Sequence, residues 1–149
     1  MPAVESNAAD TKPSGTQGES PLSRSLQGLR ILVVEDNPYI ALALEDMLAE
    51  QGLVIAGVAG TLDDALLLAA SAKLDLALLD VNIGEKKIDS VAEALQARDV
   101  PFVFTTGCGR AGLPEAFVDR PIVEKPFYIE EILQALASLP PRPGVDALR

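Results

Sequence analysis

Residues 75–84 read DLALLDVNIG, an apolar run that ends on the acidic residue Asp80. The apolar part is typical of a strand buried in a core. A lone carboxylate in such a place is costly in free energy unless another group pairs with it or it becomes neutral. The partners of Asp80 must therefore come from other parts of the chain, and the fold decides which parts these are.

Strand-like and helix-like segments alternate along the chain. Apolar runs predict five strands, at residues 30–35, 53–59, 75–80, 101–106 and 121–125. Amphipathic runs predict helices after four of these strands, at residues 38–52, 61–72, 90–99 and 128–139. Pro38 suits a first helical position, and Thr61 suits an N-cap. The alternation predicts a doubly wound α/β fold, a five-stranded parallel sheet with helices on both faces.

The segment after the fourth expected strand is irregular. Residues 107–120 read GCGRAGLPEAFVDR, which contains three glycines and a proline. Glycine and proline both disfavour a helix interior, so only a short helix is expected, around residues 114–118. We expect this segment to be the least stable part of the folded region.

Composition predicts one domain with loose ends. The chain has 149 residues and is 48% hydrophobic, which suits a single compact domain over residues 29–139. Residues 1–28 are rich in Ser, Gly, Pro, Asn and Gln and predict a disordered leader. Residues 140–149 begin with prolines and predict a flexible tail.

Charge and cysteine content exclude several classes of function. Acidic residues outnumber basic ones 22 to 12, for a formal net charge of −10, which opposes binding to nucleic acid or to an anionic membrane. No stretch resembles a membrane span or a signal peptide, and the single cysteine, Cys108, suits a reducing compartment, so we expect a cytoplasmic protein. The absence of histidine excludes Ser-His-Asp and Cys-His catalysts within this chain.

Polar side chains stand at the expected strand ends. Glu35 and Asp36 close the first strand, Asp80 the third, Thr106 the fourth and Lys125 the fifth. In a doubly wound sheet the carboxyl ends of the strands share one edge, where ligands bind. Three carboxylates there repel one another, and one lysine neutralises only one of them. Because Mg²⁺ prefers oxygen ligands, the sequence predicts a magnesium site at this edge.

A carboxylate beside Mg²⁺, a lysine and a hydroxyl is suited to accept a phosphoryl group as an aspartyl phosphate. Asp80 is the expected nucleophile, because a flexible loop, residues 81–87, follows it and gives access. Asp36 is expected to bind the metal directly, Glu35 through water, and Asn82 through its backbone carbonyl. Lys125 is expected to hold one phosphoryl oxygen.

Four motifs resemble, in order and spacing, the receiver domain of two-component response regulators: ILVVEDN, LALLDVN, FVFTTG and VEKPF. The resemblance covers residues 29–139 and implies a flavodoxin-like sheet of strand order 2-1-3-4-5. It implies that Glu35 and Asp36 are the acidic pair, Asp80 the phosphoacceptor and Thr106 the switch hydroxyl, with Lys125 as the lysine of the site. It also implies a cis peptide bond between Lys125 and Pro126.

Two features set this chain apart from many receivers. Ile122 stands three residues before Lys125, where many receivers have a switch Tyr or Phe. The stretch FTTGCGRAGLP resembles the FATGUY subgroup, whose members are commonly single-domain receivers with a poorly formed fourth helix. The resemblance therefore implies a lone receiver that takes phosphate from a sensor histidine kinase or a histidine phosphotransfer protein. It implies signalling to a downstream protein, and no enzyme beyond self-catalysed phosphotransfer and autodephosphorylation.

Some alternatives stay open at this point. Glu35 and Asp36 could instead form a solvated turn or cap the helix that begins at Pro38. Thr105 is next to Thr106 and equally a hydroxyl. A Mg²⁺-dependent phosphatase would also use an aspartyl phosphate, but it would want an acid two residues past the nucleophile, where Asn82 stands. A receiver-like binding module without phosphorylation is the third alternative.

Overall fold

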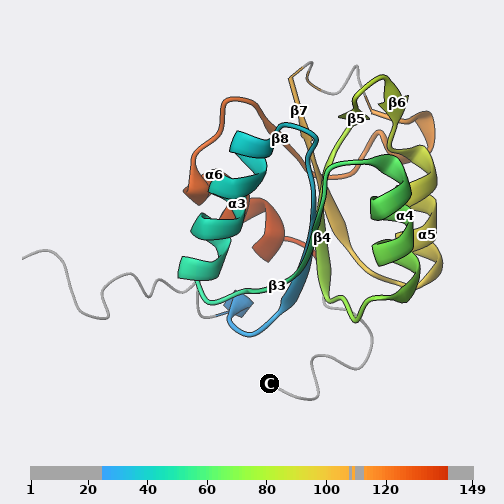
Figure 1. The fold of residues 1–149 in the computed structure, drawn as a ribbon. Coiled ribbons are helices and arrows are strands. Elements are labelled where there is room, and N and C mark those ends of the chain that lie inside the picture. The colour runs from blue at the N-terminus through green and yellow to red at the C-terminus, as the bar shows by residue number, and fades with distance from the viewer. Residues whose placement is uncertain (1–24, 108, 110–112, 141–149) are drawn as a thin grey trace, which may run out of the picture.

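The structure is a computed structural model that describes residues 25–107, 109 and 113–140 (Figure 1). Its centre is a five-stranded sheet in the order β3-β2-β4-β7-β8, and every neighbouring pair is parallel. The strands are β2 (Arg30–Val34), β3 (Val54–Ala59), β4 (Leu76–Asp80), β7 (Phe102–Thr106) and β8 (Ile122–Glu124). This is the order 2-1-3-4-5, so the predicted doubly wound fold is confirmed.

Helices cover both faces of the sheet. In Figure 1, α3 (Pro38–Glu50) and α6 (Ile129–Ala137) lie on one face, and α4 (Leu62–Ser71) and α5 (Asp89–Ala97) lie on the other. Every residue of β4 and β7 is buried, as expected for central strands that are covered on both sides. No helix among the described residues is long and apolar enough to cross a membrane.

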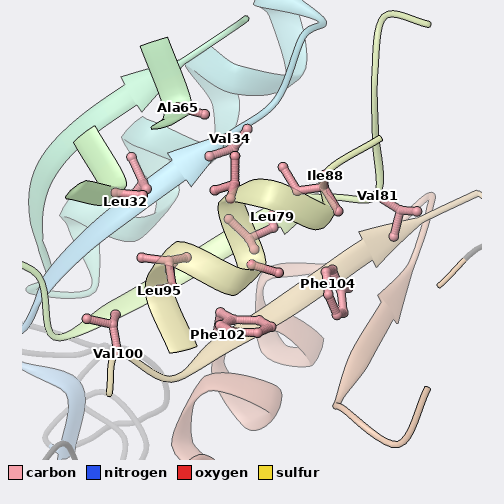
Figure 2. Close-up of a cluster of buried hydrophobic side chains, with 14 of the residues drawn as sticks. Leu32, Val34, Ala65, Leu79, Val81, Ile88, Leu95, Val100, Phe102 and Phe104 are labelled. Atoms are coloured by element: carbon pink, nitrogen blue, oxygen red, sulfur yellow. The ribbon is translucent and has the colours of Figure 1, made fainter. Parts of the chain in front are cut away.

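Each face of the sheet has its own hydrophobic cluster. The cluster under α4 and α5 contains the strand residues Leu32, Leu79, Phe102 and Phe104, several of which Figure 2 shows meeting Leu95 of α5. The cluster under α3 and α6 takes the alternate residues of the same strands, such as Ile31 and Val103. The strands are thus held between two cores, and their carboxyl ends are fixed in relation to one another.

Local signals set the starts of the helices. The side chain of Asn37 accepts hydrogen bonds from Tyr39 N and Ile40 N, and Pro38 occupies the first turn of α3. The alternative that Glu35 or Asp36 caps this helix is therefore wrong. Thr61 caps α4 as predicted, because its hydroxyl accepts the N–H of Asp64 at 3.2 Å.

The segment after Asp80 differs from the loop expected there. Two short antiparallel strands, β5 (Asn82–Ile83) and β6 (Lys86–Lys87), form a hairpin whose tip has Gly84 at φ +61°. A positive φ at only the first central residue is typical of a type II′ turn, which favours glycine there. Ile83 is buried, so the expected flexible loop is instead a hairpin packed against the core.

The irregular segment after β7 contains a 3-10 helix, η2 (Glu115–Phe117), at the position expected for a short helix. Phe117 is buried, and its ring centroid lies 5.6 Å from that of Phe102 and 6.2 Å from that of Phe104. The guanidinium of Arg120 lies over the Phe102 and Phe117 rings, 4.9 and 5.4 Å from their centroids. Cys108 lies outside the described residues.

The packed part of the chain begins before residue 29. Leu26 is only 3% exposed and belongs to the cluster under α3 and α6, and Gly28 N donates to Gly52 O at 2.8 Å. Residues 25–28 therefore pack with the domain instead of belonging to the leader. The predictions for residues 1–24 and 141–149 fall outside the described residues.

One arginine joins the two helices of the same face. Arg98, at the end of α5, donates from Nη1 to Ala69 O at 2.6 Å and from Nη2 to Ala72 O at 2.8 Å. These carbonyls belong to the last turn of α4, where helices leave acceptors without intrahelical partners. The two helices are thus tied at their carboxyl ends.

Candidate functional site

The three predicted carboxylates meet at the carboxyl edge of the sheet. Glu35 and Asp36 follow β2, and Asp80 is the last residue of β4, the strand beside it. One carboxylate oxygen from each of the three residues lies within 4.8 Å of the other two. The topology therefore brings together residues that are about 45 positions apart in the sequence.

Lys125 completes the cluster from the other side. Its Nζ lies 3.0 Å from Glu35 Oε1 and 3.1 Å from Asp80 Oδ2. The contact with Asp80 has hydrogen-bond geometry, whereas the contact with Glu35 is an ion pair only. The peptide bond after Lys125 is cis, as the resemblance implied. One ammonium thus bridges two carboxylates.

Two of the three carboxylates are buried, which raises the free energy of their charged forms. Glu35 is 2% exposed and Asp80 is 6% exposed, whereas Asp36 is exposed. Burial raises the pKa of Glu35 above its ordinary value, although the pairing with Lys125 and the N–H of Asn37 act against the shift. Burial acts to lower the pKa of Lys125, but pairing with Glu35 and Asp80 outweighs it, so this pKa is raised.

Each carboxylate also accepts a backbone N–H. Asn37 N donates to Glu35 Oε2 at 3.1 Å. Asn82 N donates to Asp80 Oδ1 at 3.3 Å, and Gly84 N donates to Asp36 Oδ2 at 2.7 Å. Hydrogen bonds of this kind fix the orientation of a carboxylate. The site therefore holds three oriented carboxylates against a single ammonium.

This arrangement fits a divalent cation. Three carboxylates face one ammonium at a partly buried edge, and each carboxylate offers an oxygen ligand within 4.8 Å of the other two. Mg²⁺ is bound in proteins by a few carboxylates together with water, and it leaves positions for phosphate oxygens. Glu35, Asp36 and Asp80 are the residues that would hold it.

Two neighbouring threonines, Thr105 and Thr106, both lie at the end of β7, beside the strand that ends at Asp80. Thr106 ends β7 and its Oγ1 donates to Gly109 O at 3.3 Å, whereas Thr105 is the register partner of Asp80. Both threonines are buried, so the choice of Thr106 as the switch hydroxyl stays a prediction. Ile122 pairs in register with Phe104 and packs against the cluster under α4 and α5. In this chain that position holds a partly buried apolar residue.

Asn82 lies beside Asp80 as predicted, but the contact that the structure gives is a different one. Its N–H donates to Asp80, whereas its carbonyl was expected to bind the metal, and that role stays a prediction. The contribution of Gly84 was not predicted at all. A weak signal for it existed, because glycine is the favoured first central residue of a two-residue type II′ hairpin turn.

Comparisons with known proteins agree with this geometry. A family model described as Response regulator receiver domain matches residues 31–137. The chain is 33% identical over 111 residues to Transcriptional regulatory protein PdtaR of Mycobacterium tuberculosis, covering 72% of this chain and 54% of that protein. It is 34% identical over 106 residues to Phyllosphere-induced regulator PhyR of Methylorubrum extorquens, covering 65% of this chain and 38% of that protein.

A solved structure resembles this chain over most of the length of both proteins. The solution structure of SdrG from Sphingomonas melonis Fr1 is 42% identical, with a TM-score of 0.65, and covers 72% of this chain and 92% of that one. The chain spans about half the length, or less, of the curated relatives it matches. The matched region contains the carboxylates and the lysine described above, and the chain belongs to the response regulator receiver family.

Proposed function

We propose that this chain receives a phosphoryl group on Asp80 in a Mg²⁺-dependent reaction and signals through protein contacts. The observation that carries the proposal is the state of Asp80: 6% exposed, at the end of a central strand, paired with Lys125 at 3.1 Å and grouped with two further carboxylates. This combination of a held nucleophile and a neighbouring ammonium suits phosphoryl transfer, which depends mainly on positioning and charge stabilisation.

The donor in this proposal is a phosphohistidine of another protein, a sensor histidine kinase or a histidine phosphotransfer protein, because this chain contains no histidine. In the transfer, the P–N bond to the imidazole breaks and a P–O bond to Asp80 forms, while the imidazole takes up a proton. Mg²⁺, when bound, would neutralise charge on the phosphoryl oxygens. Lys125 would hold a phosphoryl oxygen with the ammonium that now pairs with Asp80 and Glu35.

An apolar groove next to Lys125 supports docking of the donor protein at this edge. The groove has a volume of about 510 Å³ and is lined by residues of α3 and of the chain after β8: Tyr39, Ile40, Ala43, Met47, Lys125, Pro126 and Phe127. Lys125 belongs both to the groove and to the carboxylate site. A helix that presents a phosphohistidine would therefore bring it towards Asp80 when it binds there.

The central test is intact-mass analysis after incubation with acetyl phosphate and Mg²⁺. The parent protein is expected to gain one phosphoryl group, and Asp80→Asn is expected to gain none, because it removes the nucleophile and keeps the shape. Asp36→Asn should need more Mg²⁺ for the same gain, and Lys125→Ala should fold but transfer poorly or fail to signal. Thr106→Ala should accept phosphate and respond to it weakly. Equal labelling of Asp80→Asn would refute the site assignment.

The groove is tested by comparing two donors. Tyr39 is 83% exposed on α3, and Tyr39→Asp should slow transfer from a purified histidine phosphotransfer protein while transfer from acetyl phosphate stays unchanged. Leu67 is 66% exposed on α4, on the opposite face of the sheet, so Leu67→Asp is the matched control. Equal effects of the two variants on the transfer rate would mean that the donor protein docks on another surface.

A separate measurement addresses the phosphatase alternative. Turnover of free phosphate esters by this protein would favour that alternative over the proposed function.

A further inference from the structure

One hairpin contacts two different carboxylates of the site through its backbone. Asn82, at the start of β5, donates its N–H to Asp80, and Gly84, at the tip, donates its N–H to Asp36 at 2.7 Å. Asp36 and Gly84 are 48 residues apart in the sequence. The hairpin therefore links the end of β4 to the segment that follows β2.

The hairpin is anchored at its base. Ile83 is 4% exposed and Ile88 is fully buried, and both belong to the cluster under α4 and α5, where Figure 2 shows Ile88 near Val81. Ile88 N donates to Val81 O at 3.2 Å, which closes the hairpin where it leaves the sheet. The tip is thus supported by buried side chains as well as by its own strand pairing.

The bond from Gly84 acts on the most exposed of the three carboxylates. Asp36 is exposed, and unlike Glu35 and Asp80 it has no ion pair with Lys125 among the contacts of the described residues. A hydrogen bond to one carboxylate oxygen restricts rotation of the group and leaves the other oxygen to bind a cation. Groups that orient a metal ligand in this way commonly change metal affinity when they are removed.

We propose that the β5–β6 hairpin is a positioning element that sets the Mg²⁺ affinity of the site, with the N–H of Gly84 holding Asp36 in its binding orientation. The inference rests on the proposed function for the identity of the cation, and it is independent of whether Asp80 is phosphorylated. Gly84 is a positioning residue, since it acts on the cation through Asp36.

The backbone conformation of Gly84 allows a clean test. Its φ is +61°, so any residue with a Cβ would strain the backbone here, and that Cβ would meet no atom within 4 Å. Gly28 offers a matched control, because its φ is +82° and its Cβ would also meet nothing within 4 Å. Gly28 precedes the amino end of β2, whereas Glu35 and Asp36 follow its carboxyl end.

The experiment compares Mg²⁺ binding by isothermal titration calorimetry in the full chain, with thermal unfolding measured in parallel. Gly84→Val should weaken Mg²⁺ binding about tenfold, and Gly28→Val should leave the affinity unchanged despite a similar loss of stability. Gly84→Asn should restore most of the affinity, because asparagine tolerates a positive φ in turns. Should Gly84→Val fail to fold, Gly84→Ala replaces it in the same comparison.

A second readout follows the hydrogen bond itself. In the parent protein, Mg²⁺ should slow hydrogen exchange of the backbone amide of residue 84. The same amide should show no such slowing in Gly84→Val. Unchanged affinity in Gly84→Val, equal weakening in Gly28→Val, or no Mg²⁺ binding by the parent protein would each overturn the inference. If the parent protein binds Mg²⁺ as expected but Asp80 gains no phosphate, the proposed function fails and the positioning role of Gly84 stands.

Discussion

The chain leaves the sheet after β4 and after β7 in two contrasting ways. After β4, residues 82–87 form a hairpin whose backbone donates to two carboxylates of the site. After β7, the described residues 113–120 contain the short helix η2, whose Phe117 packs on aromatic rings, and Arg120 after it lies over two of these rings. The hairpin is thus held by hydrogen bonds to charged groups, and the segment around η2 by packing on aromatic rings.

This difference assigns separate tasks to the two segments. Hydrogen bonds to ionised groups are directional, so the hairpin suits the exact placement of ligands. The segment around η2 is held by packing on aromatic rings, and we expect it to be the segment that shifts once the site changes. We expect the hairpin side to bind the cation with little rearrangement and the η2 side to move when phosphate arrives.

The largest expected effect is on the apolar side. Phe117→Ala removes a buried ring that packs on Phe102 and Phe104, and it should lower the free energy of unfolding by about 3–5 kcal/mol. Urea denaturation measures the change, and Tyr39→Ala, at an 83% exposed position, is the control. A loss below about 0.5 kcal/mol, the range of ordinary surface changes, would mean that this ring does not hold the segment.

The hairpin should depend on its buried base. Ile83→Ala is expected to lower the free energy of unfolding by about 2–4 kcal/mol, because it leaves a cavity in the cluster under α4 and α5. It should also speed amide exchange at Gly84, whose N–H bond needs the tip in place. Denaturation together with exchange checks this. Fast exchange at Gly84 in the parent protein would remove the contrast between the two segments.

The effect of removing Lys125 should depend on pH. Lys125→Met leaves Glu35 and Asp80 without their ammonium and should cost about 1–3 kcal/mol in the absence of Mg²⁺. The pKa of Lys125 is raised in the folded protein above its ordinary value of 10.5. The ion pairing of Lys125 therefore adds fully to the free energy of unfolding below pH 10.5, and this addition is lost as the pH rises through the folded-state pKa. Denaturation of both proteins along this range should show the difference between them shrink. A constant difference would disprove the ion pairing.

The smallest expected effect concerns Arg120. Arg120→Gln removes a cation that lies over the rings of Phe102 and Phe117 and should cost about 1 kcal/mol. Thermal unfolding of this variant should show a shift smaller than that of Phe117→Ala. A larger shift would indicate that the guanidinium, rather than the ring, anchors the segment.

The sequence predicted the carboxylate and lysine positions because they follow from topology. Once the strands are assigned, a parallel sheet places Glu35, Asp80 and Lys125 at one edge without any knowledge of side-chain packing. The short helix near residue 115 was likewise predicted from glycine and proline content. These features depend on local pattern and on one rule of fold geometry.

Other features depend on contacts that local pattern does not carry. The hairpin has only two residues in each strand and two lysines in one of them, so no apolar alternation marks it. Leu26 is a single apolar residue next to a polar stretch, and composition averaged over the leader conceals its burial. The bond between Gly84 and Asp36 joins distant residues, and its donor is a backbone N–H. Residue types alone therefore do not predict which donor Asp36 meets.

The arginine at the end of α5 has a consequence for how a signal would spread. Through Arg98 the last turn of α4 is fastened to α5, and α5 itself begins one residue after Ile88 at the base of the hairpin. A tilt of α5 would therefore move the carboxyl end of α4 as well. A partner that binds across the two helices would therefore meet a single joined surface.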